Sequence, residues 1–165
     1  MNSDILYYER QRAPWFWAII LLPINIPFIY GLIKQLILNK PWGNNPMSDI
    51  GLILVSVCVF LLSILMITVK LETFITKEGI FVRFFPFLIR CRFYSWDKIN
   101  QVEIKKYAPL KHYGGWGFRI GMNGSIAFNM RGNIGLELVL NNGRKVLIGT
   151  NNPQEMETAI AKFRK

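Results

Sequence analysis

The hydrophobic pattern of the chain is dominated by an uncharged run of twenty residues from Ile50 to Val69, IGLILVSVCVFLLSILMITV. A helix of this length covers the hydrocarbon core of a bilayer, which is about 30 Å thick. In water, its apolar side chains would be exposed on every face of the helix. The run therefore predicts a transmembrane helix over about residues 50–69, with a buried core helix as the alternative.

A second uncharged run, Ala13 to Ile33, predicts another transmembrane helix over about residues 14–36. Pro23 and Pro27 lack a backbone donor and predict a kink. Charged residues precede this run and it has no small-residue cleavage site, which disfavours the alternative of a cleaved signal peptide. The connection from Asn39 to Asp49 is rich in Pro, Gly and Asn, so we expect an antiparallel helical hairpin.

Basic residues predict the orientation of this hairpin. Arg10 and Arg12 precede the first run, Lys70 and Lys77 follow the second, and only Lys40 lies in the connection. Because cytoplasmic flanks carry the excess of Lys and Arg, both termini are predicted to be cytoplasmic. Cys58 lies within a run and Cys91 beyond it, which excludes a disulfide framework within the chain and fits a reducing compartment.

After Lys70 the hydrophobic period changes to two, which indicates β-strands. The predicted strands are Leu71 to Thr76, Ile80 to Phe85, Ile89 to Ser95, the stretch around Val102 and Ile104, Leu136 to Leu140 and Arg144 to Gly149, with weaker candidates at Trp116 to Ile120 and Ser125 to Asn129. In the third strand, Ile89, Cys91 and Phe93 alternate with Arg90, Arg92 and Tyr94, so the apolar set is expected to be buried. About seven strands predict a small antiparallel sandwich or barrel.

The chain is predicted to end in a helix over residues 152–164. Asn152 is a candidate N-cap, and an apolar stripe formed by Met156, Ala159, Ile160 and Phe163 can cover an open end of the sheets. The sequence thus divides into an N-terminal segment with the two-helix anchor, residues 1–70, and a β domain, residues 71–165.

Charge is distributed unevenly between these two parts. The chain is 52% hydrophobic yet has a net charge of +10. Four basic and three acidic residues precede Lys70, whereas sixteen and seven follow from Lys70 onward. Because the anchor holds the domain at a membrane, we expect an anionic leaflet rather than nucleic acid as the negative partner. The candidate interaction surface consists of Arg90, Arg92, Lys105, Lys106, Lys111, Trp116 and Arg119. The alternative is that the basic residues serve only solubility.

The glycine-rich motif from Gly114 to Arg119, GGWGFR, has two readings. Glycines permit a tight turn with the Trp116 indole packed in the core. Alternatively, the motif is an exposed aromatic loop, with Arg119 beside it, that contacts lipid headgroups or a partner. It lacks the Lys-Ser/Thr ending of a phosphate-binding P-loop.

Residues for catalysis are few. His112 is the only histidine, so one chain cannot assemble a multi-histidine or Cys-rich metal site. No third residue at a recognisable spacing orients a pair of His112 with Cys91 or a serine. We therefore expect no catalytic, metal or cofactor residues. Asn123 begins a glycosylation sequon that would be inert in a cytoplasmic domain.

Four segments that follow the two apolar runs, TKEGIFVRF, SWDKINQVEI, YGGWGFRIG and GLELVLNNGRKVLIGTNNPQEMETAI, resemble bacterial membrane-anchored proteins with a pleckstrin-homology-like domain. The resemblance covers essentially residues 10 to 165 and is most specific at Gly114 to Arg119 and Gly135 to Ile160. It implies a strongly bent pair of sheets with seven strands, closed by a C-terminal helix, at the inner membrane. Members of this family mostly lack an assigned biochemical activity.

These observations predict a non-enzymatic interaction or regulatory module at the cytoplasmic face of the bacterial inner membrane. Its expected partners are the lipid bilayer, anionic headgroups and an unidentified protein, with no cofactor. The first alternative is a structural subunit of a homo-oligomer or larger membrane complex, with Asn25, Gly31, Gly51, Ser56 and Ser63 at helix contacts. A membrane-bound enzyme is a remote alternative.

Overall fold

The computed structural model describes residues 5–121 and 124–163, and the chain forms two compact units. The helical unit comprises residues 13–69. The β unit combines the segment that ends at Arg12 with the chain from Lys70 onward. The sequence-based division grouped residues 1–70 together, whereas the structure moves the part before the helices into the β unit. The β unit is therefore made of two stretches of chain separated by a helical insertion.

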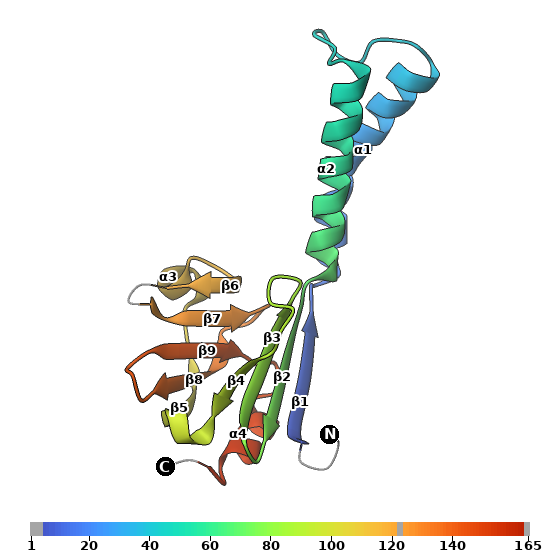
Figure 1. The fold of residues 1–165 in the computed structure, drawn as a ribbon. Helices are drawn as coiled ribbons and strands as arrows, with labels where there is room; N and C mark the ends of the chain where they lie inside the picture. Colours follow the sequence, from blue (N-terminus) through green and yellow to red (C-terminus); the bar gives the residue numbers. More distant parts are fainter. Residues whose placement is uncertain (1–4, 122–123, 164–165) are drawn as a thin grey trace. The chain divides into compact units, whose positions relative to one another are not determined.

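The helical unit contains α1 (Phe16–Leu32), which continues into the short π-helix η1 (Ile33–Ile37), and α2 (Asp49–Thr68) (Figure 1). α1 runs through Pro23 and Pro27. Both helical stretches are long and apolar enough to cross a membrane, and few of their side chains are buried within the chain. The two predicted apolar helices are therefore confirmed as helices.

Two polar side chains within these apolar helices, Asn25 and Ser63, hydrogen-bond to each other inside the helical unit. Asn25 Nδ2 donates hydrogen bonds to Ser63 Oγ at 2.9 Å and to the Leu21 carbonyl oxygen at 2.7 Å. A Cβ at Gly31 would lie 2.7 Å from the ring of Trp42, so glycine lets the indole pack against α1. Three of the five residues that the structural-subunit hypothesis assigned to helix contacts, Asn25, Gly31 and Ser63, thus make contacts within one chain.

Among the described residues, nine strands form the two sheets of the β unit (Figure 1). The first sheet is antiparallel and has the order β1 (Ile5–Arg12), β2 (Lys70–Thr76), β3 (Gly79–Phe85) and β4 (Arg92–Ser95). The second has the order β5 (Ile99–Lys106), β8 (Ile134–Leu140), β9 (Lys145–Gly149), β7 (Ile126–Asn129) and β6 (Gly117–Ile120), in which β7 and β9 run parallel. The sandwich prediction is thus confirmed only in outline, because the strands number nine rather than about seven and the second sheet is mixed.

β1 is the strand that the sequence analysis did not predict. It pairs with β2 from Arg12 opposite Lys70 to Ile5 opposite Thr76. Its inward-facing residues Tyr7, Glu9 and Gln11 are all buried. Because these side chains are polar, the strand lacks the apolar alternation by which strands are recognised.

Two short helices, α3 (Pro109–Tyr113) and α4 (Pro153–Ile160), and the 3-10 turn η2 (Trp96–Lys98) complete the β unit. α4 confirms the predicted C-terminal helix but is shorter than residues 152–164, and Arg164 and Lys165 lie outside the described residues. Met156 and Ile160 of α4 are fully buried, and α4 contacts β1 and β5. The helix therefore covers one end of the two sheets, as its apolar stripe predicted (Figure 1). α3 was not predicted, and the sequon residue Asn123 lies outside the described residues.

The predicted burial of Ile89, Cys91 and Phe93 is wrong. Ile89 is 73% exposed and Phe93 47% exposed, and Cys91 is also exposed. The strand begins only at Arg92, whose guanidinium carbon lies 5.6 Å from the centre of the Phe118 ring and 5.9 Å from that of Phe128. The positive guanidinium is stabilised over these aromatic rings, so the arginine rather than its apolar neighbours occupies the inner face.

Candidate interaction surface

The outer face of the first sheet, turned away from the core, carries a row of aromatic side chains, which we call the aromatic row. Tyr8 pairs with Phe74, Phe74 with Phe81, and Phe81 with Phe93, so one aromatic residue from each strand lies in register. The ring centres of the stacked pairs lie 4.7 Å apart for Tyr8 and Phe74 and 4.4 Å apart for Phe81 and Phe93. The two outer members, Tyr8 and Phe93, are exposed. Aromatic side chains thus extend across all four strands on an exposed face.

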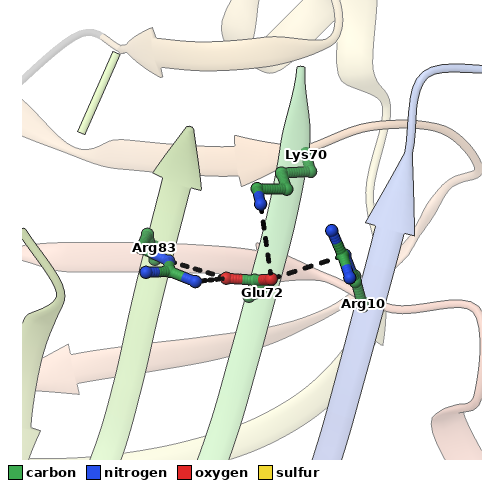
Figure 2. A network of polar contacts seen from close by, with 4 residues as sticks. All are labelled: Arg10, Lys70, Glu72 and Arg83. Atoms are coloured by element: carbon green, nitrogen blue, oxygen red, sulfur yellow. Dashed lines mark hydrogen bonds and ion pairs between the residues drawn. The ribbon is translucent and has the colours of Figure 1, made fainter. Parts of the chain in front are cut away.

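Next to this row lies a cluster of three cations around one carboxylate, the Glu72 cluster. Figure 2 shows Glu72 of β2 between Arg83 of β3 and Arg10 of β1, with Lys70 above it. Arg83 donates hydrogen bonds to one carboxylate oxygen, while Arg10 Nε lies 3.4 Å and Lys70 Nζ 4.0 Å from the other. The Glu72 side chain is only 4% exposed, whereas those of Arg10 and Arg83 are 37% and 36% exposed.

Electrostatics make the exposed part of this cluster positive. The hydrogen bond to Glu72 raises the pKa of Arg83 above its ordinary value, so this guanidinium is always charged. One buried carboxylate faces three cations, and the excess positive charge belongs to the side chains that reach solvent. The cluster therefore offers cationic hydrogen-bond donors to an anionic partner.

At one end of the sheet, Arg12, Lys70 and Phe85 form a third row of paired residues, the junction row. Lys70 Nζ lies 5.1 Å from the centre of the Phe85 ring, and Arg12 is exposed. α1 begins at Phe16, shortly after Arg12, and α2 ends at Thr68, just before Lys70. One cation, Arg12, thus lies where the chain leaves the β unit for the helices, and the other, Lys70, lies where the chain returns.

The seven residues predicted as an interaction surface are not brought together on one face. Lys105 and Lys106 lie on β5 and Arg119 on β6, at opposite edges of the five-stranded sheet. Lys105 forms an ion pair with Glu137, and Arg92 faces the interior. Arg90 and Lys111 are exposed in the β3–β4 loop and on α3, respectively. The predicted set therefore divides between several places on the β unit.

The motif from Gly114 to Arg119 contains features of both predicted readings. Gly114 ends α3 in the left-handed conformation, with φ of 69°, so the turn is confirmed. Trp116 is 44% exposed and donates from Nε1 to the Gly132 carbonyl oxygen, so it is not a core residue. Arg119 Nε donates to the carbonyl oxygen of Trp116 at 3.1 Å. The structure therefore places Arg119 of β6 against the backbone of Trp116, which lies in the exposed turn before this strand.

In the described parts of the chain, no group of three or more His, Cys, Asp or Glu residues could hold a metal ion. His112 lies with its ring 6.4 Å from that of Tyr113, and both cysteines are free.

Sequence reasoning missed the aromatic row and the Glu72 cluster. Lys70, Glu72 and Phe74 alternate in β2 as outward-facing residues, which was a usable signal. Their partners on β1 could be found only once that strand was known to pair with β2.

Comparison with known proteins identifies a family for the chain. No curated protein matches the chain. A family described as a family of unknown function (DUF6141) matches residues 8–163, a range that begins in β1 and includes both helices of the helical unit and all of α4. The chain therefore belongs to this family of unknown function.

Proposed function

We propose that the chain is a non-enzymatic interaction module anchored at the cytoplasmic face of the bacterial inner membrane. Its two apolar helices cross the bilayer as a hairpin, and its β unit is a variant of the pleckstrin-homology-like sandwich with an added N-terminal strand. Its partners are anionic lipid headgroups and an unidentified protein. The Glu72 cluster and the junction row supply the cationic donors that such headgroups attract.

The observation that carries this proposal is the pairing of β1 with β2. β1 precedes α1 and β2 follows α2, yet the two strands are paired along seven registered positions. Paired strands lie side by side, and a sheet with open edges does not form inside the hydrocarbon. Both strands therefore lie on the same side of the membrane. The chain between them crosses an even number of times, as a hairpin of two helices does.

The side of the membrane follows from the flanking charges. The helical hairpin is flanked, where it joins the β unit, by the basic residues Arg10, Arg12 and Lys70. The connection between its two helices has only Lys40. This asymmetry supports a cytoplasmic β unit.

Reporter fusions test the topology. A reporter fused after Lys165 is expected to be active only if it works in the cytoplasm, and one inserted near Asn44 only if it works after export. If the C-terminal fusion were active only with the exported reporter, and the insertion near Asn44 only with the cytoplasmic one, the orientation would be the reverse of the one proposed. Cytoplasmic signals at both places would show that the helices do not cross.

A further inference from the structure

We propose that the β3–β4 loop, residues 86–91 with the sequence PFLIRC, inserts among the anionic lipid headgroups of the membrane that the helices cross. The inference rests on the proposed function and names the part of the β unit that meets the lipid.

The loop exposes apolar side chains next to a cation. Phe87 is 52% exposed and Ile89 73% exposed, and Arg90 beside them is exposed as well. Single exposed apolar residues are common on soluble proteins. The position of this loop in the β unit gives these two residues their significance.

The strand register places the loop at the end of the sheet that joins the helices. The loop follows Phe85 directly, and Phe85 pairs with Lys70, which pairs with Arg12. The loop therefore emerges from the junction row (Figure 1). Three residues connect Arg12 to α1, and a fully extended segment of that length reaches about 10 Å. If the helices span the bilayer, this end of the sheet stays close to the membrane surface.

The chemistry at this end favours lipid over a second copy of the chain. Arg12, Lys70 and Arg90 give it an excess of positive charge, and aromatic and cationic side chains together are typical of the interfacial zone of membranes. A second copy would bring the same cations against these, which is unfavourable. An anionic leaflet provides negative charge for the cations and an apolar layer for Phe87 and Ile89.

Collisional quenching of a fluorophore on full-length protein tests the proposal. Three single-cysteine chains are reconstituted in vesicles of phosphatidylglycerol and phosphatidylcholine and labelled with an environment-sensitive dye. One carries Ile89→Cys and one Glu78→Cys, both with Cys58→Ala and Cys91→Ser. The third retains Cys58 of α2 and carries only Cys91→Ser. Glu78 is exposed in the β2–β3 turn, at the opposite end of the same strands, and is the matched control.

The label at position 89 is expected to be quenched by lipids with a shallow spin label and to be several-fold less accessible to aqueous iodide than the label at 78. Adding Arg90→Ala, or replacing phosphatidylglycerol by phosphatidylcholine, is expected to reduce the lipid quenching. Iodide quenching at 89 equal to that at 78 overturns the proposal, and so does shielding from iodide without lipid quenching, which indicates a protein contact. Lipid quenching that is equal in neutral vesicles overturns the requirement for anionic headgroups.

Cys58 separates failure of this inference from failure of the proposed function. If lipids with a spin label deep in the acyl chain quench the label at position 58, and no lipid quenches the label at 89, the membrane anchor stands and only the proposed insertion of the loop is rejected. A label at 58 that is accessible to iodide rejects the anchor itself.

Discussion

Replacing Glu9 with alanine is expected to destabilise the β unit by about 3 kcal/mol or more, because several buried donors lose their acceptor. The Glu9 carboxylate accepts hydrogen bonds from Tyr7 Oη at 2.6 Å, Thr150 Oγ1 at 2.7 Å and the Asn151 backbone N–H at 2.8 Å. Burial raises the pKa of Tyr7 well above its ordinary value, so its hydroxyl stays protonated and donates. Glu9 thus connects β1 to the two residues that directly follow β9.

Hydrogen exchange of the full-length chain in detergent, followed by mass spectrometry, measures this loss separately for each unit. Peptides from β2 and β8 are expected to exchange about 100-fold faster in Glu9→Ala if they open by global unfolding, since each 1.4 kcal/mol is a factor of ten. The matched control is Glu103→Ala, which removes an exposed carboxylate of β5 and is expected to change stability by less than about 0.5 kcal/mol. Equal exchange in both variants would show that β1 contributes little to the stability of the β unit.

Simultaneous replacement of Met156 and Ile160 by alanine is expected to have the largest effect of any change discussed. Both residues belong to α4 and their side chains are fully buried. Truncating one such side chain to alanine lowers the free energy of unfolding by about 2 to 5 kcal/mol. The sum approaches the whole stability of a domain, which is about 5 to 15 kcal/mol. We therefore expect the β unit to be largely unfolded while α1 and α2 stay helical.

Thermal melting of the detergent-solubilised chain, followed through the β signal in circular dichroism, checks this expectation. Thr158→Ala, on the exposed side of α4, is the control and is expected to leave the transition within a few degrees of the original. A cooperative β transition that persists unchanged in the double variant would mean that α4 does not stabilise the sheets.

Local signals determined how much of the fold could be predicted from the sequence. The β8–β9 hairpin was found because Asn141, Asn142 and Gly143 form a turn between two runs rich in apolar residues, and all of these signals lie close together in the chain. β1 was not found, because its buried side chains are polar and its partner strand lies beyond both helices. Alternation predicted that Arg92 would face solvent. It faces the interior because aromatic rings from β6 and β7 stabilise its charge there.

The candidate surface was less accessible to prediction than the fold. The basic excess after Lys70 was visible, but the grouping of the cations depended on which strands are neighbours. Lys105 and Arg119 were assigned to one surface although β5 and β6 lie at opposite edges of their sheet. Arg10 and Arg83 were not assigned to it, although both lie beside Glu72.

The separation of β1 from β2 by the helical unit also constrains the order of events during synthesis. β1 leaves the ribosome first, but its hydrogen-bonding partner is not made until both helices have followed. The first sheet therefore cannot form until both helices have been synthesised, so folding of the β unit is expected to follow synthesis of the helical unit. The same arrangement suggests a soluble form of the protein: if residues 13–69 were excised and Arg12 joined to Lys70 through a two-residue turn such as Asn-Gly, β1 and β2 would become an ordinary hairpin.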